Sequence, residues 1–364
     1  MKLDFVQIRD FRNIDELSFT PSEQLNVFLG DNGSGKSSIL EAIHYLGFAR
    51  SFRTAKHKSV IQSGKQEFTV FAQIFAKQVR NKLGFSRSVD DVSLVSVDGV
   101  KSKSLVDFVS LLPVQIFTPQ SSDLIIGSPK LRRKYLDWLM FHVEPEFATL
   151  ASLSRRCLLQ LNAVYKNRSR GGMHHESRYW AEQLDDYGQK LSDLRNDIMQ
   201  SEFLDIIHYN LREFLPEFDF DISYYKGWER ELSLLESINK NFERDLRNGF
   251  VAAGPHKADV RIKSNGVLAN ELLSRGQLRM LVAALQIAQI EYLQSKFSKS
   301  VVFLLDDIGA ELDSFKQEIF INKLLSMESQ VFVTAIDSRQ LTYLSNYENK
   351  KLFHVEHGQV REES

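Results

Sequence analysis

Residues 30 to 38, GDNGSGKSS, have the residue types and the spacing of a phosphate-binding loop. In this pattern a glycine, four further residues, a second glycine, a lysine and a serine follow one another. Glycines let successive backbone amides turn toward a β-phosphate, lysine adds charge at the β- and γ-phosphates, and a serine hydroxyl can bind Mg²⁺. The predicted ligands of a nucleoside triphosphate are Gly30, Asp31, Asn32, Gly33, Ser34, Gly35, Lys36, Ser37 and Ser38, with Ser37 also binding the metal.

Residues 301 to 307, VVFLLDD, form an apolar run that ends in two acids. A buried strand of this kind carries its last side chains to the edge of a parallel sheet where ligands bind. We expect Asp306 to bind magnesium and Asp307 to orient or deprotonate an attacking water. Many related sites have glutamate at the second position, and the shorter aspartate therefore predicts slow hydrolysis.

These candidates need a sheet that brings them together. Residues 25–29 are a short, mostly apolar run that predicts a strand. Residues 301–305 and 331–333 are apolar without alternation, which is typical of strands buried on both faces of a parallel sheet. Helical spacing of apolar residues begins near Lys36, directly after the glycine-rich segment. Strand, loop and helix in this order are the context that a phosphate-binding loop requires.

Two other regions follow different patterns. Residues 66–106 alternate as antiparallel strands do, with Asp98-Gly99 as a hairpin turn. Helical spacing returns from Ser128-Pro129, and from Trp180 to Ile198 an apolar stripe steps by four and three residues, which predicts a short antiparallel coiled-coil hairpin. The predicted fold is an α/β P-loop domain with a mixed or parallel sheet, flanking helices and an antiparallel β subdomain, interrupted by a helical arm. The expected divisions are 1–120, 121–248 and 249–364.

Composition restricts the class of protein. The 364 residues include one cysteine, Cys157, which excludes an internal disulfide and a cysteine-rich zinc site. The N-terminal residues lack a signal-peptide pattern, and no run of ~18 uncharged apolar residues occurs, so we expect a cytoplasmic protein that does not enter a membrane. The net charge of −1 means that any nucleic-acid surface must be a local patch.

Three basic clusters could form such a patch. The first, within residues 50–58, is Arg50, Arg53, Lys56 and Lys58. The second is Lys77, Arg80, Lys82 and Arg87, and the third, near the expected hairpin tip, is Lys166, Arg168, Arg170 and Arg178. Each could bind DNA phosphates by charge, and we expect the first to do so.

A further motif, Ser274-Arg275-Gly276-Gln277, begins a predicted helix. It resembles the Ser-x-Gly-Gln signature of ABC-type ATPases, in which the signature of one subunit caps the γ-phosphate bound by the other. A serine hydroxyl, a glycine and a helix N-terminus together make an anion site. The resemblance implies that Ser274, Gly276 and Gln277 are nucleotide ligands of an ATP-dependent dimer. Residues 309–313, GAELD, resemble the D-loop, with Asp313 near the dimer seam.

From end to end the chain resembles the RecF family of bacterial recombination and repair proteins, in the branch of chromosome-maintenance and double-strand-break ATPases. The segments that carry the resemblance are IRDFRNIDEL (8–17), ARSFRT (49–54), GSPKLRRKYLDW (127–138), GPHKAD (254–259), SRGQLR (274–279) and LLDDIGAELD (304–313). Lys257 and Ala258 depart from the arginine and aspartate that the family commonly has there.

The resemblance implies an ABC-type ATPase head with an inserted arm and a function in recombinational DNA repair. It implies ATP and Mg²⁺ as cofactors, an ATP-driven head-to-head homodimer, and binding to single- and double-stranded DNA at gaps or junctions. It also implies work with RecO and RecR in RecA loading, replication restart and SOS induction. Hydrolysis would be weak, stimulated by DNA, and would reset the dimer.

Other classes fit the sequence less well. A metabolic P-loop kinase does not need Ser-x-Gly-Gln, and a GTPase needs an Asn-Lys-x-Asp motif that is absent. A transporter ATPase has a switch histidine, where Thr334 stands here, and lacks the large insertion. A nuclease of the overcoming-lysogenization-defect type needs a further domain after Asp313, for which the remaining residues are too few. The Q-loop glutamine is either Gln120 or Gln115.

Overall fold

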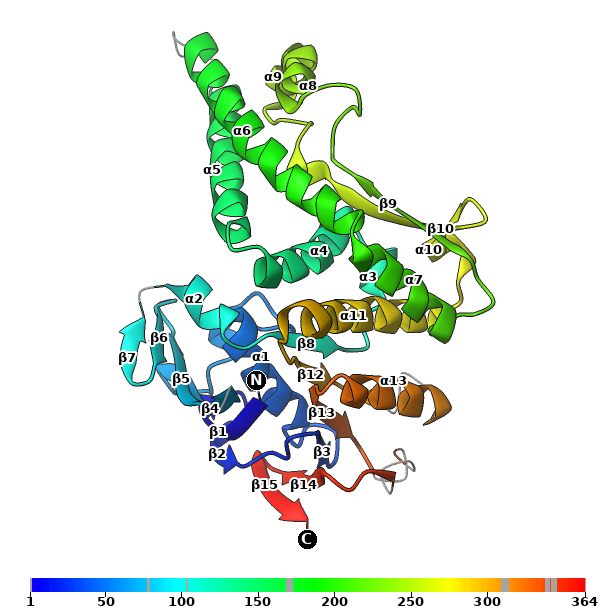
Figure 1. The fold of residues 1–364 in the computed structure, drawn as a ribbon. Helices are drawn as coiled ribbons and strands as arrows, with labels where there is room; N and C mark the ends of the chain where they lie inside the picture. Colours follow the sequence, from blue (N-terminus) through cyan, green and yellow to red (C-terminus); the bar gives the residue numbers. More distant parts are fainter. Residues whose placement is uncertain are drawn as a thin grey trace. The chain divides into compact units, whose positions relative to one another are not determined.

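The computed structural model describes residues 2–76, 79–102, 104–167, 173–308, 314–337, 341 and 346–363 (Figure 1). The chain divides into two compact units, residues 1–121 with 290–364, and residues 122–289. The boundary after residue 121 lies one residue from the expected boundary after residue 120. The expected boundary after residue 248 does not coincide with the end of a compact unit, because the following strand, β10 (Asp259–Ser264), pairs with β9 (Phe220–Tyr225).

The central sheet of the first unit is mostly parallel, and its strand order is β15-β14-β3-β13-β12-β8. The strands are β3 (Leu25–Leu29), β8 (Val114–Phe117), β12 (Val302–Leu305), β13 (Gln330–Ala335), β14 (Lys350–Glu356) and β15 (Gln359–Glu363). Every residue of β3, β12 and β13 is buried, which confirms the three strands expected from apolar runs. Only β15 pairs antiparallel, as the partner of β14 in a hairpin.

A second sheet of this unit is antiparallel throughout, in the order β2-β1-β4-β5-β6-β7. Its strands are β1 (Lys2–Phe11), β2 (Ile14–Phe19), β4 (Glu67–Ala76), β5 (Val79–Ser88), β6 (Ser93–Val97) and β7 (Val100–Ser102). The expected turn joins β6 to β7, where Asp98 and Gly99 have φ angles of 52° and 80°. The antiparallel β subdomain is therefore confirmed.

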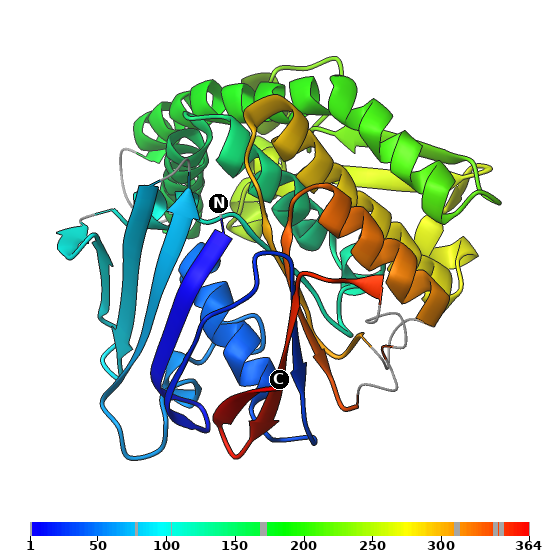
Figure 2. The same cartoon turned by 60° about the horizontal axis from the view of Figure 1, so that its bottom comes forward.

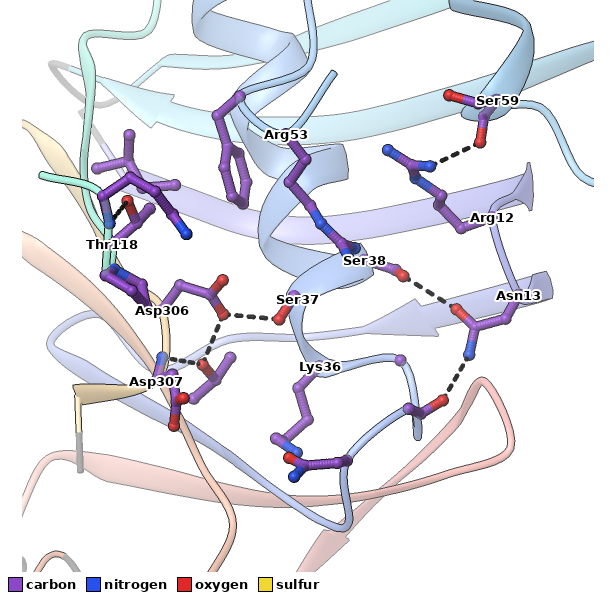
Figure 3. Close-up of a pocket in the computed structure, with 18 of the residues that line it drawn as sticks. Arg12, Asn13, Lys36, Ser37, Ser38, Arg53, Ser59, Thr118, Asp306 and Asp307 are labelled. Atoms are coloured by element: carbon purple, nitrogen blue, oxygen red, sulfur yellow. Dashed lines mark hydrogen bonds between the residues drawn. The ribbon is translucent and has the colours of Figure 1, made fainter. Parts of the chain in front are cut away.

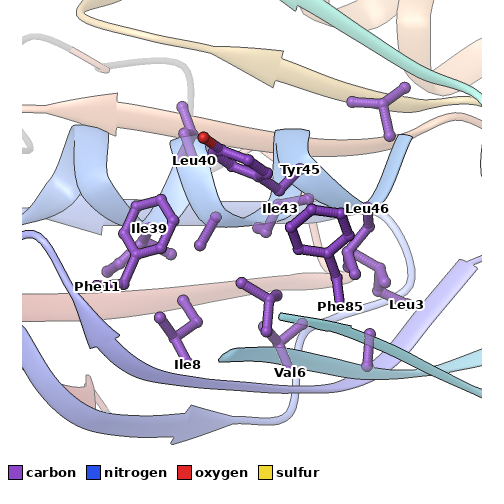
Figure 4. Close-up of a cluster of buried hydrophobic side chains, with 14 of the residues drawn as sticks. Leu3, Val6, Ile8, Phe11, Ile39, Leu40, Ile43, Tyr45, Leu46 and Phe85 are labelled. Atoms are coloured by element: carbon purple, nitrogen blue, oxygen red, sulfur yellow. The ribbon is translucent and has the colours of Figure 1, made fainter. Parts of the chain in front are cut away.

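Helix α1 (Lys36–Phe48) lies between these two sheets, as Figure 2 shows. Its apolar side chains, including Ile39, Ile43 and Leu46, pack in one buried cluster with Val6 and Ile8 of β1 (Figure 4). The same cluster contains side chains of β3, β12, β13 and β14. Burial on both sides fixes α1 firmly, and with it the loop that precedes the helix. The unit also contains α2 (Leu105–Ser110), α13 (Ser314–Ser326) and the 3₁₀ turn η1 (His57–Ser59).

The second unit is mainly helical. Its helices are α3 (Asp123–Ile126), α4 (Pro129–Val143), α5 (Phe147–Lys166), α6 (Met173–Met199), α7 (Glu202–Phe214), α8 (Leu234–Lys240), α9 (Phe242–Asn248) and α10 (Ala269–Leu272), with a 3₁₀ turn η2 (Pro255–Lys257). Helix α11 (Arg275–Phe297) begins in this unit, and β11 (Val267–Leu268) completes a three-stranded sheet in the order β11-β10-β9.

Helices α5 and α6 lie side by side as the expected arm (Figure 1). Cys157, Leu161 and Tyr165 of α5 share a buried cluster with Leu184 of α6. The predicted stripe is buried at Leu184, Leu191 and Ile198. Among the described residues, no helix combines the length and the apolar character needed to cross a membrane.

Candidate functional site

A cavity of about 1290 Å³ opens at the carboxyl ends of β3, β12 and β13, and all of its lining residues belong to the first unit (Figure 3). It is lined by Arg12, Asn13, Asn32, Gly33, Gly35, Lys36, Ser37, Ser38, Phe52, Arg53, Lys58, Ser59, Ile61, Ser63, Ile116, Thr118, Pro119, Gln120, Ser121, Asp306, Asp307 and Thr334. The glycine-rich loop and the two acids, far apart in the sequence, thus meet in one pocket.

The loop between β3 and α1 depends on its glycines. Gly30, Gly33 and Gly35 have φ angles of 152°, 85° and 120°, a region that side chains disfavour. A Cβ atom on Gly30 would lie 2.3 Å from the carbonyl oxygen of Val355. The loop therefore needs glycine at position 30 for both conformation and space.

Lys36 is turned back onto this loop. Its Nζ donates hydrogen bonds to the carbonyl oxygens of Gly30, at 2.5 Å, and Asp31, at 2.9 Å. Burial lowers the pKa of Lys36, and the nearby carboxylates of Asp307, Asp306 and Asp31 oppose that shift. These two bonds use two of the three protons of the ammonium group.

The N-terminus of α1 is open to the pocket. Gly35 is its N-cap and provides no side-chain hydrogen bond to the first turn, and that turn has no acidic residue. The first residues of α1, Lys36, Ser37 and Ser38, line the cavity. Amide groups at the start of a 13-residue helix, with the positive end of its dipole, attract an anion.

The two acids follow β12 directly. The Oγ of Ser37 donates a hydrogen bond of 2.8 Å to Oδ1 of Asp306, and the Oγ1 of Thr334 donates one of 2.9 Å to the same oxygen. Burial raises the pKa of Asp306, while the bonds from Ser37 and Thr334 and the charge of Arg53 act in the opposite direction. The structure thus joins Ser37 and Asp306, the two expected magnesium ligands.

Sequence reasoning missed a second group of polar residues at this pocket. Arg12 donates through Nε to Oε2 of Glu41, at 2.9 Å, and through Nη2 to Oε1, at 2.7 Å. Its Nη1 also donates to the carbonyl of Ser59, at 2.7 Å. Next to it, Asn13 donates to the carbonyl of Gly33 and accepts a bond from Ser38. Arg12-Asn13 is visible in the sequence only as part of the opening family motif, and the buried Glu41 is indistinguishable there from other helix residues.

The first basic cluster is divided by the structure. All four residues are exposed, but Arg53 and Lys58 line the cavity, and Arg50 and Lys56 are not among its lining residues. The Nη1 of Arg53 lies 3.7 Å from Oε2 of Glu41. Two of the four cations are therefore in position to meet a ligand of the cavity, and the other two lie outside its lining.

The other two clusters acquire acidic partners or extend beyond the described residues. Arg80 pairs with Asp4 at 3.1 Å, and Arg87 pairs with Asp91. Lys77, Arg168 and Arg170 lie outside the described residues, and so do residues 309–313 with Asp313. Arg178 pairs with Glu182 at 2.8 Å.

The segment Ser274–Gln277 is in the second unit and does not line the cavity. The backbone nitrogen of Ser274 donates to Oε1 of Gln277 at 3.0 Å, and the nitrogen of Gln277 donates to Oγ of Ser274 at 3.4 Å. This reciprocal pair caps the start of α11. A Cβ atom added to Gly276 would meet nothing within 4 Å, so packing within the chain does not require glycine there.

The structure also separates the two candidate Q-loop glutamines. Gln120 lines the cavity, after a turn in which the amide of Gln120 donates to Oγ1 of Thr118 at 3.2 Å. Gln115 lies within β8 and is buried away from the cavity lining. Only Gln120 is therefore in position to reach a ligand of this pocket.

Comparisons with known proteins agree over the whole chain. Residues 2–361 match the family model described as RecF/RecN/SMC N terminal domain. The chain is 54% identical over 364 residues to the DNA replication and repair protein RecF of Pseudoalteromonas atlantica, and the match covers 100% of both chains. The chain belongs to the RecF family. The RecF of Shewanella oneidensis is 36% identical over 360 residues, which cover 99% of each chain.

Solved structures show the same fold. The structure of the recombination mediator protein RecF-ATP in the RecFOR pathway has a TM-score of 0.89 and 25% identity, and covers 100% of this chain and 98% of that one. An Smc head bound to the C-winged helix domain of ScpA, at 14% identity, has a TM-score of 0.60 and covers 100% and 98%. The expected fold class, an α/β head of the RecF and SMC kind, is confirmed.

Proposed function

We propose that this RecF-family chain is an ATP-dependent DNA-binding protein of recombinational repair, in which ATP closes a head-to-head dimer. The observation that carries the proposal is the meeting of the glycine-rich loop, Lys36, Ser37 and Asp306 in one cavity. The solved RecF-ATP structure, which has the same fold, supports ATP as the nucleotide.

The residues present fit a triphosphate. An anion site is formed by the open N-terminus of α1, the loop glycines and the charge of Lys36. The backbone amides of the loop and of the helix N-terminus can donate hydrogen bonds to the phosphate oxygens of ATP. Lys36 would exchange its bonds to the carbonyls of Gly30 and Asp31 for phosphate oxygens. The cofactor ligands we propose remain residues 30–38, with Gln120 added beside Asp306 and Asp307.

The residues also fit Mg²⁺, which prefers hard oxygen ligands such as a hydroxyl and a carboxylate. Ser37 and Asp306 would hold it, because their oxygens are already 2.8 Å apart. The described residues contain no cluster of three or more His, Cys, Asp and Glu side chains around a point, so these two residues and the phosphates would have to suffice. Bound magnesium would supply positive charge that stabilises the charge developing on the phosphates.

Asp307 is the residue we assign to the water. It follows Asp306 at the same cavity wall, where its carboxylate would orient or deprotonate the nucleophile. Replacing Asp307 by Asn should abolish turnover and leave ATP binding intact. A D307N protein that still hydrolyses ATP at the wild-type rate would contradict the assignment.

The signature segment is proposed to act on the nucleotide of a second copy. Ser274 is exposed at the start of α11, and the free space at Gly276 would let another molecule approach the backbone closely. Ser274, Gly276 and Gln277 would then cap the terminal phosphate bound by the partner. ATP would become part of the dimer interface, and slow hydrolysis would release it.

For DNA we propose Arg50 and Lys56 as the contacts of the first basic cluster, because Arg53 and Lys58 face the nucleotide cavity. The preferred DNA would contain gaps or junctions between single and double strands. The solved RecF-ATP protein is a recombination mediator of the RecFOR pathway, which supports RecO and RecR as partners here. Recruitment of RecA, replication restart and SOS induction in the cytoplasm complete the proposed function.

The central experiment is sedimentation of the chain with and without ATP and Mg²⁺, each with and without gapped DNA. The Lys36→Ala variant should stay monomeric because it cannot hold the phosphates, and Ser274→Arg should bind ATP without dimerising. Mixing the two variants should restore dimers, because one composite site forms between the intact loop of one and the intact signature of the other. A wild-type chain that stays monomeric at saturating ATP contradicts the proposal.

A second experiment compares two double variants of equal charge loss, R50A/K56A and R80A/R87A. Binding of gapped DNA is measured across a range of salt concentrations. R50A/K56A should reduce the slope of log affinity against log salt by about 2, because each phosphate contact contributes about 0.9. R80A/R87A is the control, since both arginines pair with carboxylates. The reverse result assigns the DNA contact to the second cluster.

A further inference from the structure

Thr334 links the two acids of the cavity through a single hydroxyl group. Its Oγ1 donates to Oδ1 of Asp306, at 2.9 Å, and accepts the backbone N–H of Asp307, at 2.8 Å. The side chain is almost fully buried, with 1% of its surface exposed. Both bonds are drawn at the labelled acids in Figure 3. The hydroxyl therefore donates its one proton to the carboxylate of Asp306 and accepts, through a lone pair, the backbone N–H of Asp307.

The bond to Asp307 replaces a missing bond of the sheet. β12 and β13 pair in parallel up to Leu305 and Val333, so Asp306 and Thr334 come next on the two strands. The amide of Asp306 continues the ladder on the other side, donating to the carbonyl of Phe117 at 2.9 Å. At Asp307 the chain leaves the sheet, and the threonine side chain accepts the amide that would otherwise lose its partner.

The turn at Asp307 has an unfavourable backbone conformation. Its φ angle is 54°, in the left-handed region that costs a non-glycine residue roughly 1 kcal/mol or more. The carboxylate of Asp307 is attached to this turn, so its position depends on the backbone conformation there. The group that stabilises this turn therefore decides where the carboxylate lies.

We propose that Thr334 is a positioning residue for ATP hydrolysis, whose hydroxyl holds the left-handed turn of Asp307 and the Oδ1 of Asp306 in register with Ser37. The inference rests on the proposed function, since it assigns Thr334 a part in the hydrolysis attributed to Asp307. Thr334 lines the cavity, and in this proposal it affects hydrolysis through the two acids.

The test compares Thr334→Val, which has nearly the same shape but no hydroxyl, with Thr334→Ser, which keeps it. Thr69→Val, in β4 of the other sheet, is the matched control for the same substitution away from the cavity. Single-turnover hydrolysis and ATP affinity are measured for each. T334V should slow hydrolysis by about 10- to 100-fold, the effect of one lost hydrogen bond to a charged group, while ATP affinity changes by less than about threefold. T334S should restore most of the lost rate, and T69V should resemble the wild type.

Three results would overturn the inference: T334V hydrolysing at the wild-type rate, T334S as slow as T334V, or T334V losing ATP affinity as much as rate. The last result would mean a structural role only. Hydrogen exchange at the Asp307 amide gives a readout that needs no nucleotide, and T334V alone should raise it by about tenfold or more. A wild-type chain that does not bind ATP contradicts the proposed function, and unchanged exchange in T334V contradicts the positioning role.

Discussion

The ion pair between Arg12 and Glu41 gives a prediction that can be worked out from the structure. Glu41 is fully buried on α1, and 19% of the Arg12 side chain is exposed. The pair is bidentate, with N–O distances of 2.9 and 2.7 Å, and Ser51 adds a further bond to Glu41. The perturbation is a cycle of Glu41→Gln, Arg12→Met and the double variant.

The size of the effect follows from burial. Glu41→Gln leaves the Arg12 guanidinium partly buried without its counter-charge, and breaking a buried pair in this way costs about 3–5 kcal/mol. Arg12→Met should cost less, about 2 kcal/mol, because Arg53 and Ser51 still contact Glu41. The double variant removes both charges, so its loss should be smaller than the sum of the two by about 2 kcal/mol.

The assay is urea unfolding followed by far-UV circular dichroism and by tryptophan fluorescence. All three tryptophans, at positions 138, 180 and 228, lie in the second unit. A loss of stability confined to the first unit moves the circular-dichroism transition without moving the fluorescence transition.

The matched control is the pair Arg9–Glu16 on the same β1–β2 ribbon. The Nε and Nη2 of Arg9 donate to one oxygen, Oε1 of Glu16, at 2.9 and 2.6 Å, and the two side chains are 53% and 58% exposed. Arg9→Met and Glu16→Gln should each lower the free energy of unfolding by less than about 1 kcal/mol, because solvent screens exposed pairs. If Glu41→Gln costs no more than this control, or if the Arg12 and Glu41 losses simply add, the reasoning from burial is wrong.

Three other predictions concern pH, the loop and the second unit. Burial lowers the pKa of His44 to about 3, so the folded state favours its neutral form. The contribution of His44 to stability should be constant above the ordinary pKa of about 6.5 and fall as pH drops from there toward 3, by up to about 1.4 kcal/mol per pH unit. Unfolding midpoints across this range should change less in His44→Asn, and equal slopes would exclude His44 as the cause. Gly358, whose amide donates to the carbonyl of Ser34, has a φ of 75°, and a Cβ atom there would lie 2.3 Å from the oxygen of Asn13. Gly358→Ala should therefore weaken ATP binding in a titration, whereas Gly266→Ala, at a φ of 80° with open space, should not. Asp137→Asn breaks the pair with Arg195, of which 5% is exposed, and should shift the tryptophan transition by about 3 kcal/mol or more, whereas an unmoved transition would contradict a contribution of this pair to the second unit.

Much of the fold could be predicted because its signals are local. The apolar runs at residues 25–29 and 301–305 predicted strands β3 and β12, and the glycines after residue 29 predicted a loop leading into α1. The Asp98-Gly99 turn and the stripe from Trp180 to Ile198 likewise depend on conformational preferences within a few residues. Such preferences act between neighbours in the chain and can therefore be recognised in a single sequence.

The charged surfaces could not be predicted in this way. Arg80 of β5 lies in a segment without acids, yet it pairs with Asp4 of β1, which is far away in the chain. Arg50 and Arg53 are three residues apart and both exposed, yet only Arg53 lines the cavity. Charge balance at a surface depends on which strands lie side by side, and the spacing of residues along the chain does not contain that information.

The sequence by itself determined which residues could bind phosphate and magnesium, because residue type and short-range spacing set that chemistry. Only the tertiary structure decided how they are held: the pair between the cavity residue Arg12 and Glu41, the choice of Gln120 over Gln115, and the hydroxyl of Thr334 between two acids. These contacts join residues that are far apart in the sequence. Their geometry depends on sheet register and on the packing of α1 between two sheets, which arise only when distant segments come together.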